Sequence, residues 1–200
     1  MLNGESSDSF GNRCTSPRAA PVPAGQSRSQ PPFHVVSTTK VVLLSIATFG
    51  LYSIYWFWRH WALHKLDRGL KLQPLLRALF AVFFAHALNR EIDYRLQRDG
   101  IACAWRPGSW ATAYVASVLL VRVISRTPDT VLPSNLCLGL LLIPLTVHIV
   151  ALVQVQRAAN LACGDAMALQ NNRLTAGNWG WLALGGVAWL LILAGVLLPS

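Results

Sequence analysis

Four long apolar stretches recur along the chain, separated by polar and basic segments. The first, over 41–58, holds eighteen residues without a charge, and the last, over 179–198, holds twenty. An α-helix rises about 1.5 Å per residue, so the shorter of these stretches extends about 27 Å, close to the roughly 30 Å hydrocarbon core of a bilayer. We therefore predict transmembrane helices over about 41–58, 109–125, 134–154 and 178–198.

A fifth stretch, over about 74–99, predicts a helix of a different kind. Its apolar part covers about eleven residues, or roughly 16 Å of helix, which is too short to cross a bilayer unaided. Beyond that part the segment is charged, and Glu91 and Arg95 have the spacing of a helix-surface ion pair. We predict an interfacial or re-entrant helix here, and a fifth span is the alternative.

The N-terminal residues, 1–32, are rich in Ser, Pro, Gly and Arg. Such a segment buries too little apolar surface to offset its chain entropy, so we predict a disordered polar tail before a helical membrane domain over 33–199. Residues 33–37 alternate weakly and predict a short extended segment. Ser37, Thr38 or Thr39 would then cap the first helix.

The composition is that of a membrane protein. Hydrophobic residues make up 54% of the 200 residues and charged residues only 12%, about half the roughly 25% of soluble domains. The net charge is +9, and the basic residues fall mostly between the apolar stretches. This distribution favours contacts with anionic lipid head groups over nucleic acid, which requires a soluble basic face. The predicted fold is an all-α, multi-pass transmembrane helical bundle.

The positive-inside rule places the more basic side of a membrane protein in the cytoplasm. Four spans would put eleven Lys and Arg residues on one side and six on the other, with both termini outside. Five spans would put ten inside and six outside, with the N-terminus in the cytoplasm. The charge count does not decide between these arrangements, which both place the C-terminus outside. We favour four spans.

Aromatic residues crowd the end of the first stretch, in the sequence TFGLYSIYWFWRHW. Trp and Tyr gather at the membrane–water boundary because their rings join an apolar body to a polar group. The run therefore predicts a helix that leaves the bilayer, with membrane-interface anchors at Tyr52, Tyr55, Trp56, Trp58, Arg59 and Trp61.

Ionisable groups within apolar stretches are candidate functional sites, because their burial in lipid is costly. The candidates are Arg77, His86, Arg122 and His148. His60 and His64 share a helix face, but only Asp67 could join them, so we interpret them as interfacial histidines and predict no metal site. The four long stretches lack Asp and Glu and the chain holds no catalytic motif, so we expect no catalytic residue, no cofactor and no enzyme activity.

The segment VSTTKVVLLSIATFGLYSIYWFWRHW resembles a family of small bacterial multi-pass inner-membrane proteins, a domain of unknown function. The core of that family reads approximately K-x-x-x-L-S-x-x-T-F-G-L-Y-x-x-Y-W-F-Y-x-x-W, and Trp58 stands here where the family has Tyr. The later segments RALFAVFF, QRAAN and NRLTAGNW are similar to the family as well, so the resemblance covers residues 33–199. It implies a location in the bacterial inner membrane and supplies no catalytic residues.

Together these observations predict a non-enzymatic interaction or scaffold component of the membrane. Its partners would be anionic membrane lipids and other membrane proteins or further copies of itself, reached through the aromatic-basic segment and small-residue helix faces. The alternative is a small oligomeric transporter or channel, which Pro144, His148 and Arg122 favour.

Overall fold

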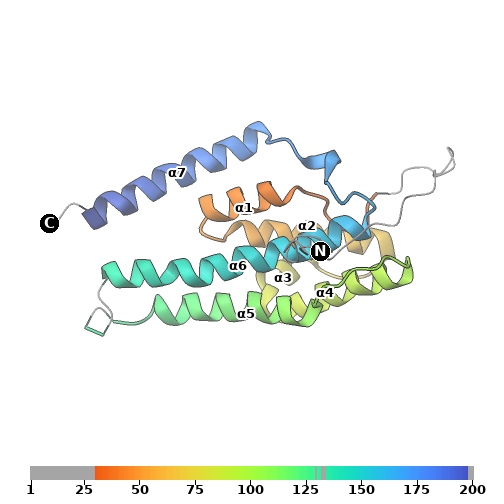
Figure 1. The fold of residues 1–200 in the computed structure, drawn as a ribbon, viewed down its shortest axis with the longest axis horizontal. Helices are drawn as coiled ribbons and strands as arrows, with labels where there is room; N and C mark the ends of the chain where they lie inside the picture. The colour runs from red at the N-terminus through yellow and green to blue at the C-terminus, as the bar shows by residue number, and fades with distance from the viewer. Residues whose placement is uncertain (1–29, 129, 132–133, 198–200) are drawn as a thin grey trace, which may run out of the picture.

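The computed structural model describes residues 30–128, 130–131 and 134–197, so the predicted disordered tail lies almost wholly outside the described residues. Every regular element of this part is helical, which confirms the predicted all-α fold (Figure 1). The elements are α1 (Thr38–Ala47), α2 (Tyr52–Arg68), α3 (Pro74–Leu79), α4 (Ala81–Arg98), α5 (Pro107–Ile124), α6 (Ser134–Ala162), the 3₁₀ helix η1 (Leu169–Asn171) and α7 (Ala176–Leu197).

Three helices, α5, α6 and α7, are long and apolar enough to cross a membrane. They match the spans predicted over 109–125, 134–154 and 178–198, although α6 is longer than predicted and continues through Pro144. Most of their side-chain surface faces outward, as expected of helices surrounded by lipid. α5 and α6 pack against each other as an antiparallel pair, and α7 lies beyond α1 (Figure 1). The chain is a helical membrane protein.

The span predicted over 41–58 does not form, because a turn divides it into α1 and α2. Phe49 and Gly50 have φ angles of 52° and 85°, in the left-handed region that ends helices. The N–H of Gly50 donates to the carbonyl of Ser45 (2.8 Å), and the N–H of Phe49 donates to that of Ile46 (3.2 Å). This is the Schellman pattern, which closes α1 and sends the chain back in the opposite direction (Figure 1).

Thr48 joins the two helices. Its Oγ1 donates to the carbonyl of Leu44 (2.7 Å) and accepts from the N–H of Tyr52 (2.9 Å), so one side chain serves the end of α1 and the start of α2. The sequence TFGLY therefore forms a tight helix–helix turn. A hydropathy count registers only that these residues are apolar, and this is why the sequence predicted one continuous helix.

The turn lies about halfway along α6 and α7 (Figure 1). Gly185, in the middle of α7, packs directly on the backbone of Ala47, and Trp189 Nε1 donates to the carbonyl of Ile46 (2.9 Å). From the middle of α6, His148 Nε2 approaches to 3.5 Å from the position that a Cβ on Gly50 would occupy. A membrane crossed by α6 and α7 would hold this turn near its centre. In such a membrane, α1 and α2 would form a re-entrant hairpin.

The helix predicted over 74–99 is also divided, at Phe80, into α3 and α4. The predicted pair of Glu91 with Arg95 is replaced by ion pairs to the end of α2. Glu91 lies 3.6 Å from Arg68, and Arg95 lies 3.5 Å from Asp67. Arg95 also pairs with Asp99 at the end of its own helix (2.7 Å), and the contacts to α2 form because α4 crosses beside the C-terminus of that helix.

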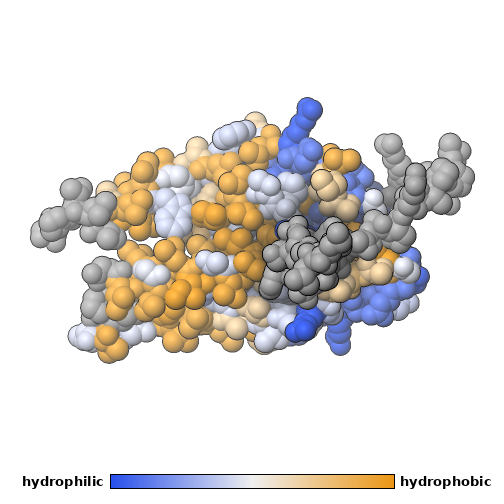
Figure 2. Space-filling model, in the orientation of Figure 1, coloured by the Kyte–Doolittle hydropathy of each residue, from blue (hydrophilic) through white to orange (hydrophobic). Residues whose placement is uncertain are grey.

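Charge is concentrated at one end of the molecule, where α2 and α6 end and α5 and α7 begin; we call it the polar end (Figure 2). Of the fourteen described Lys and Arg residues, only Arg122 and Arg126 lie at the opposite end, beside the turn between α5 and α6. The other twelve lie at or toward the polar end: Lys40, Arg59, Lys65, Arg68, Lys71, Arg77, Arg90, Arg95, Arg98, Arg106, Arg157 and Arg173. Over the same fourteen residues, the predicted four-span arrangement would give eleven against three and the five-span arrangement seven against six.

We predict that Gln30, Leu66 and Met167 face one side of the membrane and Val131 the other. All four are exposed, and the re-entrant hairpin returns the chain to the side from which it entered. Single cysteines at these positions, in a cysteine-free version, would be labelled with a membrane-impermeant maleimide on intact cells and on inverted vesicles. Labelling of Gln30→Cys and Leu66→Cys from opposite sides would contradict this and show that residues 41–58 cross the membrane as one continuous span.

The contact between α1 and α7 gives a second prediction. A Cβ at Gly185 would collide with the backbone of Ala47, whereas one at Gly186 would meet nothing within 4 Å. Gly185→Ala should therefore lower the free energy of unfolding by about 1–3 kcal/mol, which is measured as a lower midpoint of thermal unfolding in detergent. The neighbouring Gly186→Ala should leave it unchanged or raise it, and equal effects of the two substitutions would show that α7 does not pack there.

Candidate functional site

The extended segment over 33–37 lies against α6 at the polar end, and side-chain amides satisfy its backbone. Gln156 Nε2 donates to the carbonyl of His34 (2.8 Å), and Asn160 Nδ2 donates to that of Val36 (3.0 Å). Asn171, in η1, donates to the carbonyl of Val35 (3.0 Å). Ser37 is confirmed as the cap of α1: its backbone angles are extended, and its Oγ accepts from the N–H of Lys40 (3.3 Å).

Gln156 is the centre of this buried network. Its Oε1 accepts from Trp56 Nε1 (2.6 Å) and lies 3.4 Å from His60 Nε2, while its Nε2 also donates to Asn160 Oδ1 (2.7 Å). Because an amide oxygen only accepts, His60 has its proton on Nε2 in this arrangement. One side chain thus ties α2, α6 and the segment over 33–37 together.

Burial disfavours the charged form of the histidines in this region. Burial is the main cause that lowers the pKa of His34 to about 4, with further contributions from Arg59 and Lys40. Burial also lowers the pKa of His60 well below its usual value, and His34 adds to that effect. His64 lies 3.6 Å from Glu91, but the described residues contain no group of three side chains suited to a metal ion. The rings pack against one another: the ring centres of His34 and His60 are 5.9 Å apart, and those of Phe33 and His64 are 5.5 Å apart.

The predicted membrane-interface anchors divide into three groups. Trp56 and Trp61 are 0% and 1% exposed, so the prediction is wrong for these two. They face the protein core: Trp56 donates a hydrogen bond to Gln156, and the Arg77 guanidinium lies over the Trp61 ring, 4.3 Å from the ring centre. The interface role stays a prediction for Tyr55, Trp58 and Arg59, which reach the surface. Tyr52 directly follows the hairpin turn beside the middle of α6 and α7, which is away from either interface.

The four candidate intramembrane groups do not meet at one site. Arg77 stacks on Trp61 at the polar end, whereas Arg122 is exposed toward the opposite end. His86 is exposed and lies 3.1 Å from Thr112 on α5. Only His148 is buried at mid-depth, where its Nδ1 lies 3.4 Å from Ser117 Oγ and its Nε2 has no partner.

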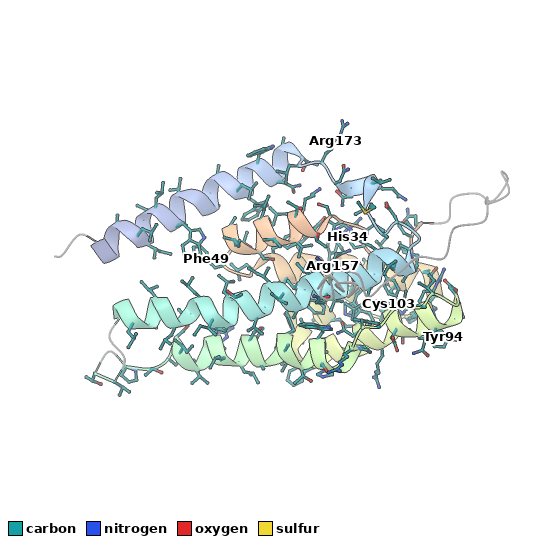
Figure 3. The ribbon with its side chains drawn as sticks, in the orientation of Figure 1. His34, Phe49, Tyr94, Cys103, Arg157 and Arg173 are labelled. Carbon is teal, nitrogen blue, oxygen red and sulfur yellow. The ribbon has the colours of Figure 1, made fainter. Side chains whose placement is uncertain are left out.

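A cavity of about 630 Å³ lies between the hairpin and α7. His34 and Phe49 lie near opposite ends of α1, and both line this cavity (Figure 3). Its mouth at the polar end carries polar side chains, and its deeper walls are apolar, including Leu44, Leu51, Trp181, Leu184 and Ala188. The volume is within the roughly 300–1,000 Å³ range of small-molecule sites. This is the principal candidate for a binding site.

Lys40 supplies the charge at the mouth of the cavity. It is 5% exposed, and its Nζ donates to Asn171 Oδ1 (2.6 Å) and the carbonyl of Arg173 (2.9 Å). The side-chain amide of Asn178 lies beside the same Nζ, at 3.3 Å. Within the described residues no carboxylate forms an ion pair with Lys40. Its positive charge is therefore held by neutral dipoles alone.

Sequence reasoning missed Lys40, Gln156, Asn160 and Asn171 as site residues. A signal was present for Gln156 and Asn160, because QRAAN places two amides one turn apart on one helix face. Comparison with family models, curated proteins and solved structures finds no match to this chain. The site is therefore argued from its geometry alone.

The network around Gln156 gives a third prediction. Gln156→Ala leaves Trp56 Nε1 and the carbonyl of His34 buried without partners, and each unsatisfied group costs about 1–3 kcal/mol. We expect a fall of about 2–5 kcal/mol in stability, measured as the thermal unfolding midpoint in detergent. The half-buried Gln154→Ala, two residues away on α6, is the matched control and should change it little. Equal midpoints would exclude a structural role for the network.

Proposed function

We propose that this protein is a non-enzymatic interaction component of the bacterial inner membrane that binds anionic lipid head groups at its polar end. The observation that carries the proposal is the distribution of charge, with twelve described Lys and Arg residues toward one end and two toward the other. By the positive-inside rule the polar end would face the cytoplasm. The bacterial location is supported by the resemblance of the TFGLY-x-x-YWF segment to a bacterial family.

Several of these cations are available to lipid. Lys71, Arg90, Arg106, Arg157 and Arg173 are exposed, and none forms an ion pair with a described carboxylate. Each Lys or Arg near an anionic leaflet contributes about 1 kcal/mol of attraction. Five such residues around one end of a helical bundle would hold a shell of anionic lipids there.

A small transporter is the second candidate, and His148 is the observation that favours it. Its ring lies at mid-depth with Nε2 unpartnered, beside Gly50 of the hairpin turn and Ser117 of α5. Ionisable groups held in this way mark substrate or proton pathways in many membrane proteins.

The fourth prediction tests the first candidate. We expect phosphatidylglycerol to raise the thermal unfolding midpoint of the purified protein more than phosphatidylcholine does, because only the former carries a net negative charge that the exposed cations attract. Changing Lys71, Arg90, Arg106, Arg157 and Arg173 together to Gln should remove most of this difference.

The matched control changes Arg122 and Arg126, at the opposite end, to Gln and should retain it. A protein indifferent to lipid charge would contradict the proposal. If vesicles that contain the protein also carried an ion flux that His148→Ala abolished, the second candidate would take its place.

A further inference from the structure

The cavity between the hairpin and α7 is polar at one end and mainly apolar along the rest of its length, where Thr48, Tyr52 and Tyr55 are the polar residues that line it. Lys40, His34, Asn171 and Asn178 lie at the polar end. Beyond them the walls pass between α1 and α7 down to Phe49 and Ala188, near the level of the hairpin turn. None of the residues that line it is acidic. A ligand that fits this cavity has an anionic group at one end and an apolar body.

The depth of the cavity matches one leaflet of a bilayer. Asn178 at the mouth and Ala188 at the deep end are ten residues apart on α7, and ten residues of α-helix extend about 15 Å. Half of a roughly 30 Å hydrocarbon core is also about 15 Å. The apolar body would therefore have the length of one acyl chain in the leaflet at the polar end.

The cavity is open sideways. Leu51, Trp181 and Leu184 line it and are still more than half exposed, so their free surfaces face the space that lipid would fill. A chain could enter laterally from the bilayer, without passing through water. This opening favours a membrane lipid over a water-soluble anion of the same charge.

Lys40 needs a counter-charge that the described residues do not supply. A charged group taken out of water is stable when it is paired, and neutral oxygens compensate it only in part. An anionic oxygen at the mouth would lie beside Nζ. In the orientation that satisfies its neighbours, Asn178 turns its amide oxygen toward Nζ (3.3 Å), so the oxygens around Nζ at the mouth are all neutral.

We propose that this cavity binds one anionic phospholipid, with its phosphate beside Lys40 and one acyl chain between the hairpin and α7. The inference rests on the proposed function, since it assigns a specific site to one of the anionic lipids that the polar end would attract. The lipid would complete the contact between α1 and α7 by filling the space beside Gly185.

The test measures the binding of phosphatidylglycerol to the full chain in neutral detergent by native mass spectrometry. Phosphatidylcholine and inorganic phosphate are the comparison ligands. We expect one phosphatidylglycerol molecule to stay bound per chain at lipid concentrations where phosphatidylcholine is no longer bound. Lys40→Gln should weaken it at least tenfold, and Lys40→Arg, which keeps the charge, should restore most of the binding.

A second pair of variants tests the position of the acyl chain. Ala188→Phe places a ring in the cavity and should also weaken binding at least tenfold. Ala183→Phe is the matched control, since Ala183 is exposed on the same helix and does not line the cavity. Thermal unfolding midpoints of both variants show whether either one is misfolded. If Ala188→Phe does not fold, Lys40→Gln still tests the cavity site.

The outcomes separate this inference from the proposed function. Tight phosphatidylglycerol binding that neither Lys40→Gln nor Ala188→Phe weakens would overturn the cavity site and leave the surface shell of lipids intact. Competition by inorganic phosphate at equal concentration would overturn the role of the acyl chain. The cavity site would be supported if Lys40→Gln and Ala188→Phe lose phosphatidylglycerol binding. The variant with the five exposed cations of the polar end changed to Gln should then retain this binding. Absence of any preference for anionic lipid would overturn both proposals.

Discussion

The structure depends on one buried amide, that of Gln156. An extended segment without a neighbouring strand brings unpaired backbone groups into the protein interior, where each would cost about 1–3 kcal/mol. Gln156 and Asn160 take the place of a strand for residues 33–37, and Gln156 binds Trp56 of α2 as well. The two bonds from Gln156 join residues 122 and 100 positions apart in the sequence. They fix the place and direction in which α1 starts.

The position of α1 then determines the path of the hairpin. A helix of ten residues that is capped by Ser37 and ends at the Schellman turn reaches only to the middle of α6 and α7. The chain must return, and α2 carries its charged C-terminal turn back to the polar end. The hairpin therefore separates charge from the apolar half of the molecule. It also leaves the space beside α7 in which Lys40 and the apolar walls face each other.

The three helices that are long and apolar enough to cross a membrane could be predicted from sequence, because α5, α6 and α7 are uncharged over most of a bilayer's thickness and hydropathy measures this directly. The hairpin could not be predicted in that way. Its turn depends on backbone angles at Phe49 and Gly50 and on the Thr48 hydroxyl, which leave the mean hydropathy high. The surroundings of Lys40 were hidden for another reason. Its partners, Asn171 and Arg173, lie more than 130 positions away, and only the folded chain brings them together.

The contact of α7 with α1 has a consequence for biosynthesis. Gly185 is 138 residues later in the sequence than Ala47, on which it packs. A ribosome that adds about 5–20 residues per second needs roughly 7–28 s to cover that distance. During this interval the outer face of α1 has no helix to cover it. The nascent hairpin must be sheltered by lipid or by the insertion machinery until the final helix is released into the membrane.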